Sequence, residues 1–205
     1  MKTIKYLFIL LFCTLLLAGC SDAPDPESSA ETTVTSYSAS DQELAVIEEM
    51  NYARTKPKEY VLNRLSNLYN SNKSESYLAA LDELIDKMDH MTPLPALETA
   101  SGLTKCAKEW VNVSGPKGTI GHDSNIARRF KKYCTYTTLG ENCSYGYPDA
   151  VEIVIGLLID DGVEGRGHRK NILSAAFTHA GAAIGTHKKY KTMCCIDFAS
   201  HYTEK

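Results

Sequence analysis

The 205-residue sequence has no hydrophobic run long enough to span a bilayer, no CxxC pair and no excess of basic residues. Its most apolar stretch, Tyr6–Leu17, is well below the roughly 20 residues that a membrane-spanning helix needs. The absence of CxxC pairs argues against a zinc cluster of thiolates. The 22 basic and 25 acidic residues give a net charge of −3, which argues against nucleic acid as a partner.

The N-terminus predicts export. Lys2 and Lys5 precede the apolar run, and Leu-Ala-Gly-Cys ends it at Cys20; this order is typical of an export signal rather than a fold element. The motif resembles the bacterial lipobox, in which the cysteine is lipidated and the signal is cut off before it. The resemblance implies removal of residues 1–19 and a lipid on Cys20 that holds the chain to the membrane of the cell envelope, facing the periplasm or the exterior. An ordinary secretory signal with an incidental cysteine is the alternative.

The remaining chain divides by composition into a tether and one domain. Residues 21–40 have almost no large apolar side chain, so we expect residues 20–40 to form a lipidated, unfolded tether. Residues 41–205 have the length of a single domain and contain no internal repeat. Without Lys2 and Lys5 the mature chain has 20 basic and 25 acidic residues, a net charge of −5.

Five of the seven cysteines remain available if Cys13 is removed and Cys20 is lipidated. They are Cys106, Cys134, Cys143, Cys194 and Cys195. Export places them where disulfides are permitted, although five cannot all pair within one chain, so the pairing stays open. The neighbours Cys194 and Cys195 would point to opposite faces of a strand.

Apolar periodicity and turn residues predict helices first and a β-hairpin last. The expected helices are 41–68 with a break at Pro57, 75–88, about 98–113, 125–132 and one that Pro148 and Asp149 open and Asp160 to Gly162 close. The expected strands are 180–185 and 193–199, with Lys188 and Lys189 in the turn between them. This order indicates an α+β fold in which helices pack on an antiparallel sheet.

Three short motifs carry residues with chemical potential. Gly121-His122-Asp123-Ser124 and Gly167-His168-Arg169 each place a histidine beside glycine in an expected loop, where such residues are commonly solvated. Gly140-Glu141-Asn142 is compatible with a simple turn, in which Glu141 would cap a helix or hold Arg169. A Ser-His-Asp triad using Ser124 and Asp123 is disfavoured, because adjacent residues rarely aim at one point.

The order of these motifs resembles the CAP superfamily, also called SCP, which includes cysteine-rich secretory proteins, antigen 5 and pathogenesis-related proteins. The series runs from Asn51-Tyr-Ala-Arg54 through Gly121-His122, Gly140-Glu141-Asn142 and Gly167-His-Arg-Lys-Asn-Ile-Leu173 to His179-Ala-Gly-Ala-Ala-Ile-Gly185 and Cys195-Ile-Asp-Phe-Ala199. The resemblance covers nearly all of residues 41–205. It implies a three-layer α-β-α sandwich with an antiparallel sheet flanked by helices.

The resemblance also implies a cleft in which two histidines and two acidic residues hold a divalent cation such as zinc. The matching positions are His122, Glu141 and His168, which are also the candidates for any catalysis. The fourth is Asp160. It follows three residues after Leu157, which stands at the position where family members often have Trp. Glu164 in the following loop is the competing choice. The sequence favours neither a metal site with an open position for water nor a metal-free site with Glu141 as general base.

Aromatic residues surround Gly-Glu-Asn, namely Tyr133, Tyr136, Tyr145 and Tyr147. Their rings would suit a cleft wall for sugar, peptide or lipid, or ordinary packing, and we expect Ser124 and Tyr145 to line the cleft. The favoured interpretation is a domain that binds an unidentified extracytoplasmic ligand. A metal-assisted hydrolase of peptide or cell-wall material, and an adhesion protein with a vestigial cleft, are the alternatives.

Overall fold

The computed structural model describes residues 39–69 and 72–205. The expected export signal, Cys20 and all but the end of the tether lie outside these residues, which belong to one compact unit, Ser36–Lys205. In the described ranges no helix has the length and apolarity to cross a membrane. The helices are α1 (Asp41–Thr55), α2 (Pro57–Tyr60), η1 (Val61–Leu65), η2 (Ser66–Leu68), α3 (Glu75–His90), α4 (Ser101–Lys117), α5 (Ile126–Tyr133), α6 (Ala150–Ile159), η3 (Glu164–Arg166) and α7 (Gly167–Ile172). The strands are β1 (Glu98–Thr99), β2 (Cys134–Thr135), β3 (Leu139–Tyr145), β4 (His179–His187), β5 (Lys191–Ala199) and β6 (Thr203–Glu204).

The main sheet of the described chain has the strand order β1-β4-β5-β3. β4 pairs antiparallel with β5, and β5 pairs antiparallel with β3. The short β1 adds to the other edge of β4 in parallel, which departs from the expected all-antiparallel sheet. A parallel partner is available there because the segment before α4 runs along β4 before entering the helix.

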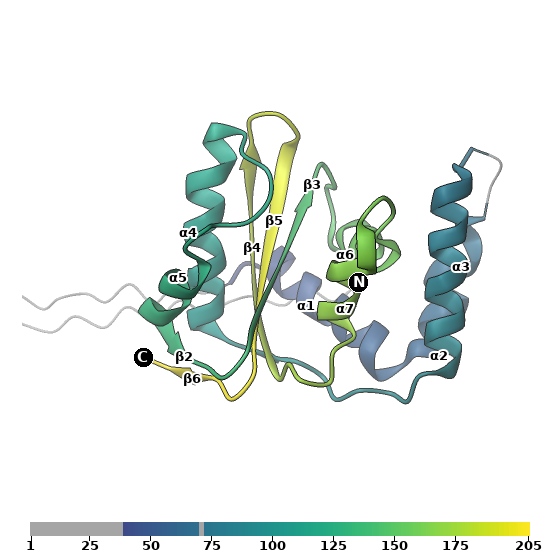
Figure 1. The fold of residues 1–205 in the computed structure, drawn as a ribbon, viewed down its shortest axis with the longest axis horizontal. Coiled ribbons are helices and arrows are strands. Elements are labelled where there is room, and N and C mark those ends of the chain that lie inside the picture. The colour runs from purple at the N-terminus through teal and green to yellow at the C-terminus, as the bar shows by residue number, and fades with distance from the viewer. Residues whose placement is uncertain (1–38, 70–71) are drawn as a thin grey trace, which may run out of the picture. The chain divides into compact units, whose positions relative to one another are not determined.

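Helices cover both faces of this sheet, so the expected α-β-α sandwich is confirmed (Figure 1). On one face α4 packs on β4 and β5, burying Trp110 and Val111 against Met193 and Cys195. On the other face α1, α3 and α6 bury the largest apolar cluster. Cys194 belongs to that second cluster and Cys195 to the first, which confirms that these neighbours face opposite sides.

Two glycines of β4 allow α4 to lie close to the sheet. A Cβ atom at Gly181 would come within 2.2 Å of the Thr104 nitrogen, and one at Gly185 within 2.4 Å of Val111 Cγ1. Real Cβ contacts are essentially never this short, so a side chain at either position would push the helix away. The Ala-Gly-x-x-Ile-Gly pattern of this strand therefore sets the spacing between two layers.

The Asn51 to Arg54 motif links α1 to two other segments, the one before β1 and the one after α7. Asn51 donates to the Leu97 carbonyl at 3.0 Å and accepts from the Leu97 nitrogen at 2.7 Å. The buried Arg54 guanidinium donates to the carbonyls of Ile172 at 2.7 Å and Ser174 at 2.8 Å. These residues stabilise the fold, because they satisfy backbone groups that are partly or fully buried.

Several expected elements are confirmed and others need correction. The break at Pro57, the helix from Glu75 and both hairpin strands occur as expected, and the Asp149 side chain caps α6. The expected helix at 98–113 is wrong at both ends: residues 98–99 form β1, and α4 continues through Pro116 to a left-handed cap at Gly118. Gly118 has no Cβ and adopts this backbone without strain.

Two site motifs also lie in different elements from those expected. Gly140-Glu141-Asn142 belongs to the buried strand β3 rather than to a turn, because its polar side chains find internal partners. His168 lies in α7 rather than in a loop. Both changes matter for the site, because regular elements hold side chains more firmly than loops do.

Candidate functional site

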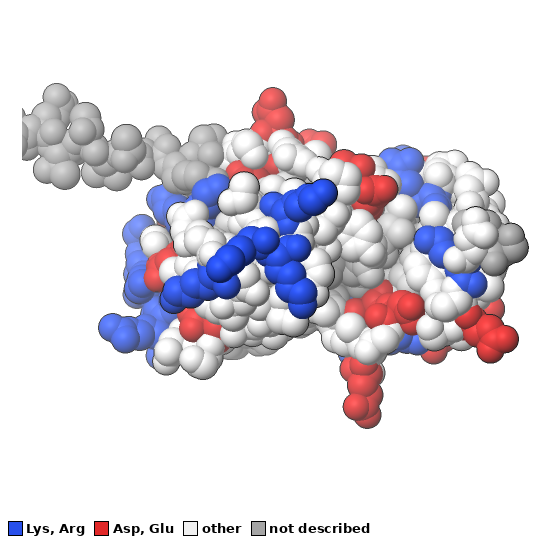
Figure 2. All heavy atoms as spheres, turned by 90° about the horizontal axis from the view of Figure 1, so that it is seen from above, with Lys and Arg blue, Asp and Glu red and all other residues white. Residues whose placement is uncertain are grey.

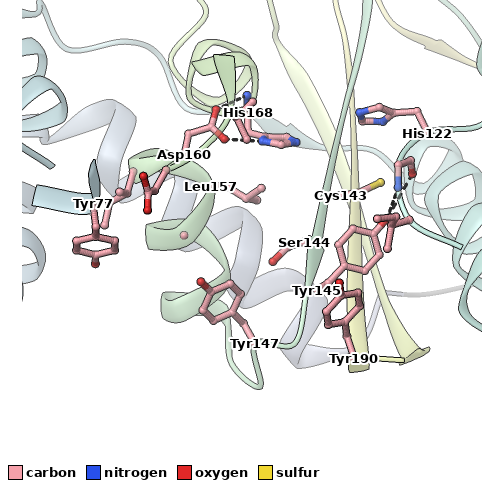
Figure 3. Close-up of a pocket in the computed structure, with 16 residues that line it drawn as sticks. Tyr77, His122, Cys143, Ser144, Tyr145, Tyr147, Leu157, Asp160, His168 and Tyr190 are labelled. Carbon is pink, nitrogen blue, oxygen red and sulfur yellow. Dashed lines mark hydrogen bonds and ion pairs between the residues drawn. The ribbon is translucent and has the colours of Figure 1, made fainter. Parts of the chain in front are cut away.

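A cavity of about 580 Å³ opens beside β3, α6 and the loop before α5. His122 and His168 lie at one end of it, on opposite sides, and the two rings face each other (Figure 3). The ring centroids are 6.5 Å apart, with 39° between the ring planes. Two histidines that are distant in the sequence therefore meet at one hollow.

His122 is positioned by a loop that two aromatic residues hold in place. Gly121 precedes it with a φ of +92°, a conformation that L side chains rarely adopt. The Gly121 nitrogen donates to the Tyr145 hydroxyl at 3.0 Å, and Trp110 Nε1 donates to the Gly121 carbonyl at 3.1 Å. The His122 side chain is half exposed to the cavity and is hydrogen-bonded through Nδ1 to Glu141 Oε1 at 2.7 Å.

His168 is held in the corresponding way by Asp160. Its Nδ1 lies 2.7 Å from Asp160 Oδ1, and its backbone nitrogen donates to Asp160 Oδ2 at 2.9 Å (Figure 3). Asp160 thus satisfies the first turn of α7 while orienting the ring. It reaches this place because it ends α6 in the left-handed conformation, with a φ of 56°, which Asp adopts more readily than most residues.

The alternative fourth residue, Glu164, lies elsewhere. It belongs to η3 and lines a separate groove with Arg166 and Glu83. Of the two acidic candidates, the structure brings Asp160 to His168. Leu157, one turn earlier in α6, lines the cavity in the position suggested for the family Trp.

Two asparagines connect the strand that carries Glu141 to the helix that carries His168. Asn171 Nδ2 donates to Asn142 Oδ1 at 2.8 Å, and Asn142 Nδ2 donates to the His168 carbonyl at 3.0 Å. Both asparagines come from the recognised motifs, Gly-Glu-Asn and Gly-His-Arg-x-Asn. The motifs therefore form one interlocked unit, which fixes the two histidines relative to each other.

Behind His122, Glu141 is part of a buried charge network. Glu141 Oε2 accepts a hydrogen bond from Arg129 of α5, and the same guanidinium nitrogen lies 3.5 Å from Asp197 Oδ1 on β5. Burial opposes ionisation of Glu141, but its hydrogen bond with His122 and the charge of Arg129 keep its pKa below the usual value. Both carboxylate oxygens of Glu141 are therefore engaged, and the acid serves as a fixed anionic support.

The anchoring of each ring at Nδ1 leaves each Nε2 as the donor atom available to a metal. Histidines that bind metals commonly donate their other ring N–H to a carboxylate, as both rings do here. Two imidazoles that share one ion at bond lengths of about 2 Å have centroids roughly 5–6 Å apart. The residues present therefore fit a divalent cation held by His122 and His168, after a small approach of the rings, with Glu141 and Asp160 as supports.

Cys143 adds a thiol to the same wall, beside His122 (Figure 3). Ligand atoms of His122, Glu141 and Cys143 all lie within 4.8 Å of one another, a grouping that does not include His168. Hydrogen bonding to Cys195 and then to His122 lowers the pKa of Cys143, despite its burial. Hydrogen bonding to Cys143 and, to a lesser extent, to Glu141 raises the pKa of His122.

Aromatic rings form the other end of the cavity. Tyr145, Tyr147 and Tyr190 line it, so the expected position of Tyr145 agrees with the structure (Figure 3). Ser124 lies instead in an exposed turn before α5, and the cavity lining in the described chain does not include it. Tyr133 and Tyr136 pack around α5, in a cluster away from this cavity.

Two residues of the site are not apparent from the sequence. Arg129 is the partner of Glu141, whereas Arg169, the partner in the alternative interpretation of Gly140-Glu141-Asn142, donates to the Leu158 and Ile159 carbonyls at the end of α6. Cys143, which the sequence offers only as a disulfide candidate, lies beside His122. Its two-residue spacing from Glu141 places both on one face of a strand, a signal that becomes readable once β3 is recognised.

A sandwich that presents two carboxylate-anchored imidazoles to one cavity defines a small domain with a histidine cleft. The particular family follows from the sequence: the chain belongs to the CAP family, the cysteine-rich secretory protein family, whose sequence model matches residues 47–198. The comparison with curated proteins found no significant match.

Solved structures with a similar fold include proteins from three bacteria. An outer surface protein from Borrelia burgdorferi is 19% identical with a TM-score of 0.45, over 71% of this chain and 94% of that one. A cysteine-rich secretory protein from Staphylococcus aureus is 18% identical with a TM-score of 0.40, over 64% and 40%. An extracellular protein with an SCP domain from Bacillus anthracis is 19% identical with a TM-score of 0.42, over 69% and 49%. This chain thus spans less than half of the last two, and the likeness carries no information on ligand or activity.

Proposed function

We propose that this protein is a ligand-binding CAP domain, held outside the cytoplasm by a lipid on Cys20, whose His122 and His168 bind a divalent cation such as zinc. The observation that carries the proposal is the matched pair of imidazoles, each anchored at Nδ1 by a buried carboxylate and each turned toward one cavity. Such anchoring orients a ring for metal binding at its other nitrogen.

The chain's own residues prepare the site before any ion arrives. Glu141 and Asp160 set the orientation of the two rings, and the Asn142–Asn171 pair holds β3 against α7. A bound zinc ion would supply a Lewis acid with positions open to a ligand or water. Because the supports are buried and already hydrogen-bonded, little reorganisation accompanies binding.

The cavity favours a ligand with an apolar body and a negative end. Its rings, Tyr145, Tyr147 and Tyr190, offer flat apolar surface. Lys188 and Lys189 are exposed in the β4–β5 turn, directly before Tyr190. Basic side chains gather on the face of the molecule that Figure 2 shows. A fatty acid, an acidic peptide or an anionic glycan has this chemistry.

Metal-assisted hydrolysis is the second candidate, favoured by the space beside both imidazoles. Two protein ligands would leave coordination positions for water, whose pKa zinc lowers to about 7. The metal-free route with Glu141 as general base is disfavoured, because Arg129 and His122 already occupy its oxygens. We therefore favour binding over catalysis.

Calorimetric titration of the purified, tag-free chain with zinc chloride tests the metal proposal. We expect one ion per chain, and loss of this binding in both His122→Ala and His168→Ala. His90→Ala is the matched control, because His90 is an exposed histidine on α3 away from the cavity. Unchanged zinc binding in either cleft variant would refute the shared site; zinc binding without turnover of peptide or cell-wall substrates favours the binding function.

The lipid anchor has its own test. Metabolic labelling with radioactive palmitate in a bacterial host should mark the wild-type chain and not Cys20→Ser, and the variant should leave the membrane fraction. An unlabelled wild-type chain released into the medium would show that the N-terminus is an ordinary secretory signal.

A further inference from the structure

Two cysteines lie directly opposite each other on neighbouring strands at the wall of the cavity. Cys143 on β3 is the register partner of Cys195 on β5. Residues paired in this way in an antiparallel sheet have Cα atoms about 4.5–5.5 Å apart and side chains on the same face. Disulfides join Cα atoms about 4.4–6.8 Å apart, so the backbone already has the spacing that a bond between these sulfurs requires.

The two thiols differ in access. Cys143 lines the cavity, whereas Cys195 is fully buried behind it. The Cys195 sulfur donates to Glu141 Oε2 at 3.3 Å, and this hydrogen bond orients the inner thiol. A sulfur at the cavity wall with a second sulfur paired to it from behind is the arrangement that a pair of attacking and resolving thiols needs.

We propose that Cys143 and Cys195 form a redox-active pair that exchanges with small external disulfides entering the cavity. The spacing of the pair is set by the β3–β5 register. The substrate class is a low-molecular-weight disulfide, R–S–S–R, of the glutathione or cystine kind.

The exchange balances in two steps. Cys143, after losing its proton to water, attacks one sulfur of the external disulfide; its S–S bond breaks, a mixed disulfide Cys143–S–S–R forms, and the first RS⁻ takes up a proton. Cys195 then attacks the Cys143 sulfur, the bond from Cys143 to the S–R group breaks, and the departing second RS⁻ takes up the proton that Cys195 loses. Two protein thiols are oxidised to one disulfide, and one external disulfide is reduced to two thiols.

The neighbouring cysteines are not equivalent. Cys194 points into the opposite core, on the other side of β5, and Cys134 lies in the cluster around α5. Neither is a register partner of Cys143. Cys194 therefore provides a control that is adjacent in sequence yet excluded by the pleat of the strand.

The test equilibrates the purified chain in glutathione buffers of graded ratio, followed by acid quench, alkylation and peptide mass spectrometry. We expect a Cys143–Cys195 linked peptide pair that appears with one two-electron midpoint and disappears on reduction. The Cys195→Ala variant should instead accumulate glutathione on Cys143. Cys194→Ala should retain the wild-type link, and circular dichroism should establish that each variant is folded.

Two results would overturn the proposal. One is a wild-type chain in which Cys143 carries glutathione while Cys195 stays reduced at every ratio. The other is a linked peptide pair that joins Cys143 to a cysteine other than Cys195. Both are read on the wild-type protein, so neither depends on a variant that folds.

Discussion

Replacing Arg129 with Met removes the positive charge that two buried carboxylates share. The side chains of Arg129, Glu141 and Asp197 are only 2%, 1% and 0% exposed, so solvent does not screen the loss. Removing one partner of a buried ion pair costs about 3–5 kcal/mol, because a charge is left uncompensated. We expect Arg129→Met to lower the free energy of unfolding by about this amount, while the apolar contacts of the long side chain are largely kept.

Urea unfolding of the wild type and variant measures this loss as a shift in midpoint of more than about 1 M at similar slope. Lys132→Met is the matched control on the same helix; its ion pair with Glu109 is 48% and 32% exposed, and such pairs contribute about 0–1 kcal/mol. Folding lowers the pKa of Glu141, although burial acts in the opposite direction. The ionised carboxylate therefore stabilises the fold at pH values above the pKa that Glu141 has in the unfolded chain, and this stabilisation is lost as the pH falls. The penalty should therefore shrink in acid. Equal losses for the two variants at pH 7 would refute the buried-network reasoning.

Three further outcomes follow from the anchoring of the rings. Asp160→Asn keeps a residue that tolerates the left-handed backbone but misdirects the His168 ring, so the zinc affinity measured by calorimetry should fall about 10- to 100-fold. Glu164→Gln is the control and should leave the zinc affinity unchanged. Equal effects of the two substitutions would contradict the role of Asp160. Asn171→Ala breaks the link to Asn142 and should cost about 1–3 kcal/mol in urea unfolding, together with weaker zinc binding; a loss of stability alone would show that the link does not position His168. Hydrogen bonding to Cys143 and Glu141 raises the pKa of His122, so zinc must displace a proton from this ring when it binds near neutral pH. The zinc affinity should therefore rise about tenfold per pH unit below that pKa. A flat profile from about pH 6 to 8 would exclude proton displacement from His122.

Periodicity predicts the elements that bury a single apolar face. Helix α3 buries Leu81, Leu84 and Met88 with helical spacing after a Ser74 cap, and both expected hairpin strands are apolar runs. These patterns depend on residues that are close together in the chain. The sequence alone is therefore sufficient to predict helix α3 and the hairpin.

Strand β3 cannot be predicted from the sequence pattern, because several of its buried residues are polar. Gly140, Glu141 and Asn142 have no apolar alternation, and their burial is compensated by Arg129 and Asn171, which are distant in sequence. Such compensation is tertiary and leaves no local pattern. The Glu141 position in the site came from the family resemblance, while its guanidinium partner and the nearby thiol needed the structure.

The extension of α4 through Pro116 has a similar cause. Proline in a helix interior loses a hydrogen bond and clashes with the preceding turn, which favours an earlier end. Here Pro116 lies in the last turn, and the close contact of Gly115 with the Thr186 carbonyl region fixes the helix against β4. Tertiary packing outweighs the local preference.

Zinc soaked into crystals of the chain tests the central claim most directly, through an anomalous difference map recorded at the zinc absorption edge. The account predicts one ion between the Nε2 atoms of His122 and His168, with Glu141 and Asp160 still bonded to the opposite ring nitrogens. An ion held by Cys143 and Glu141 without His168, or rings that stay apart without an ion at saturating zinc, would contradict it.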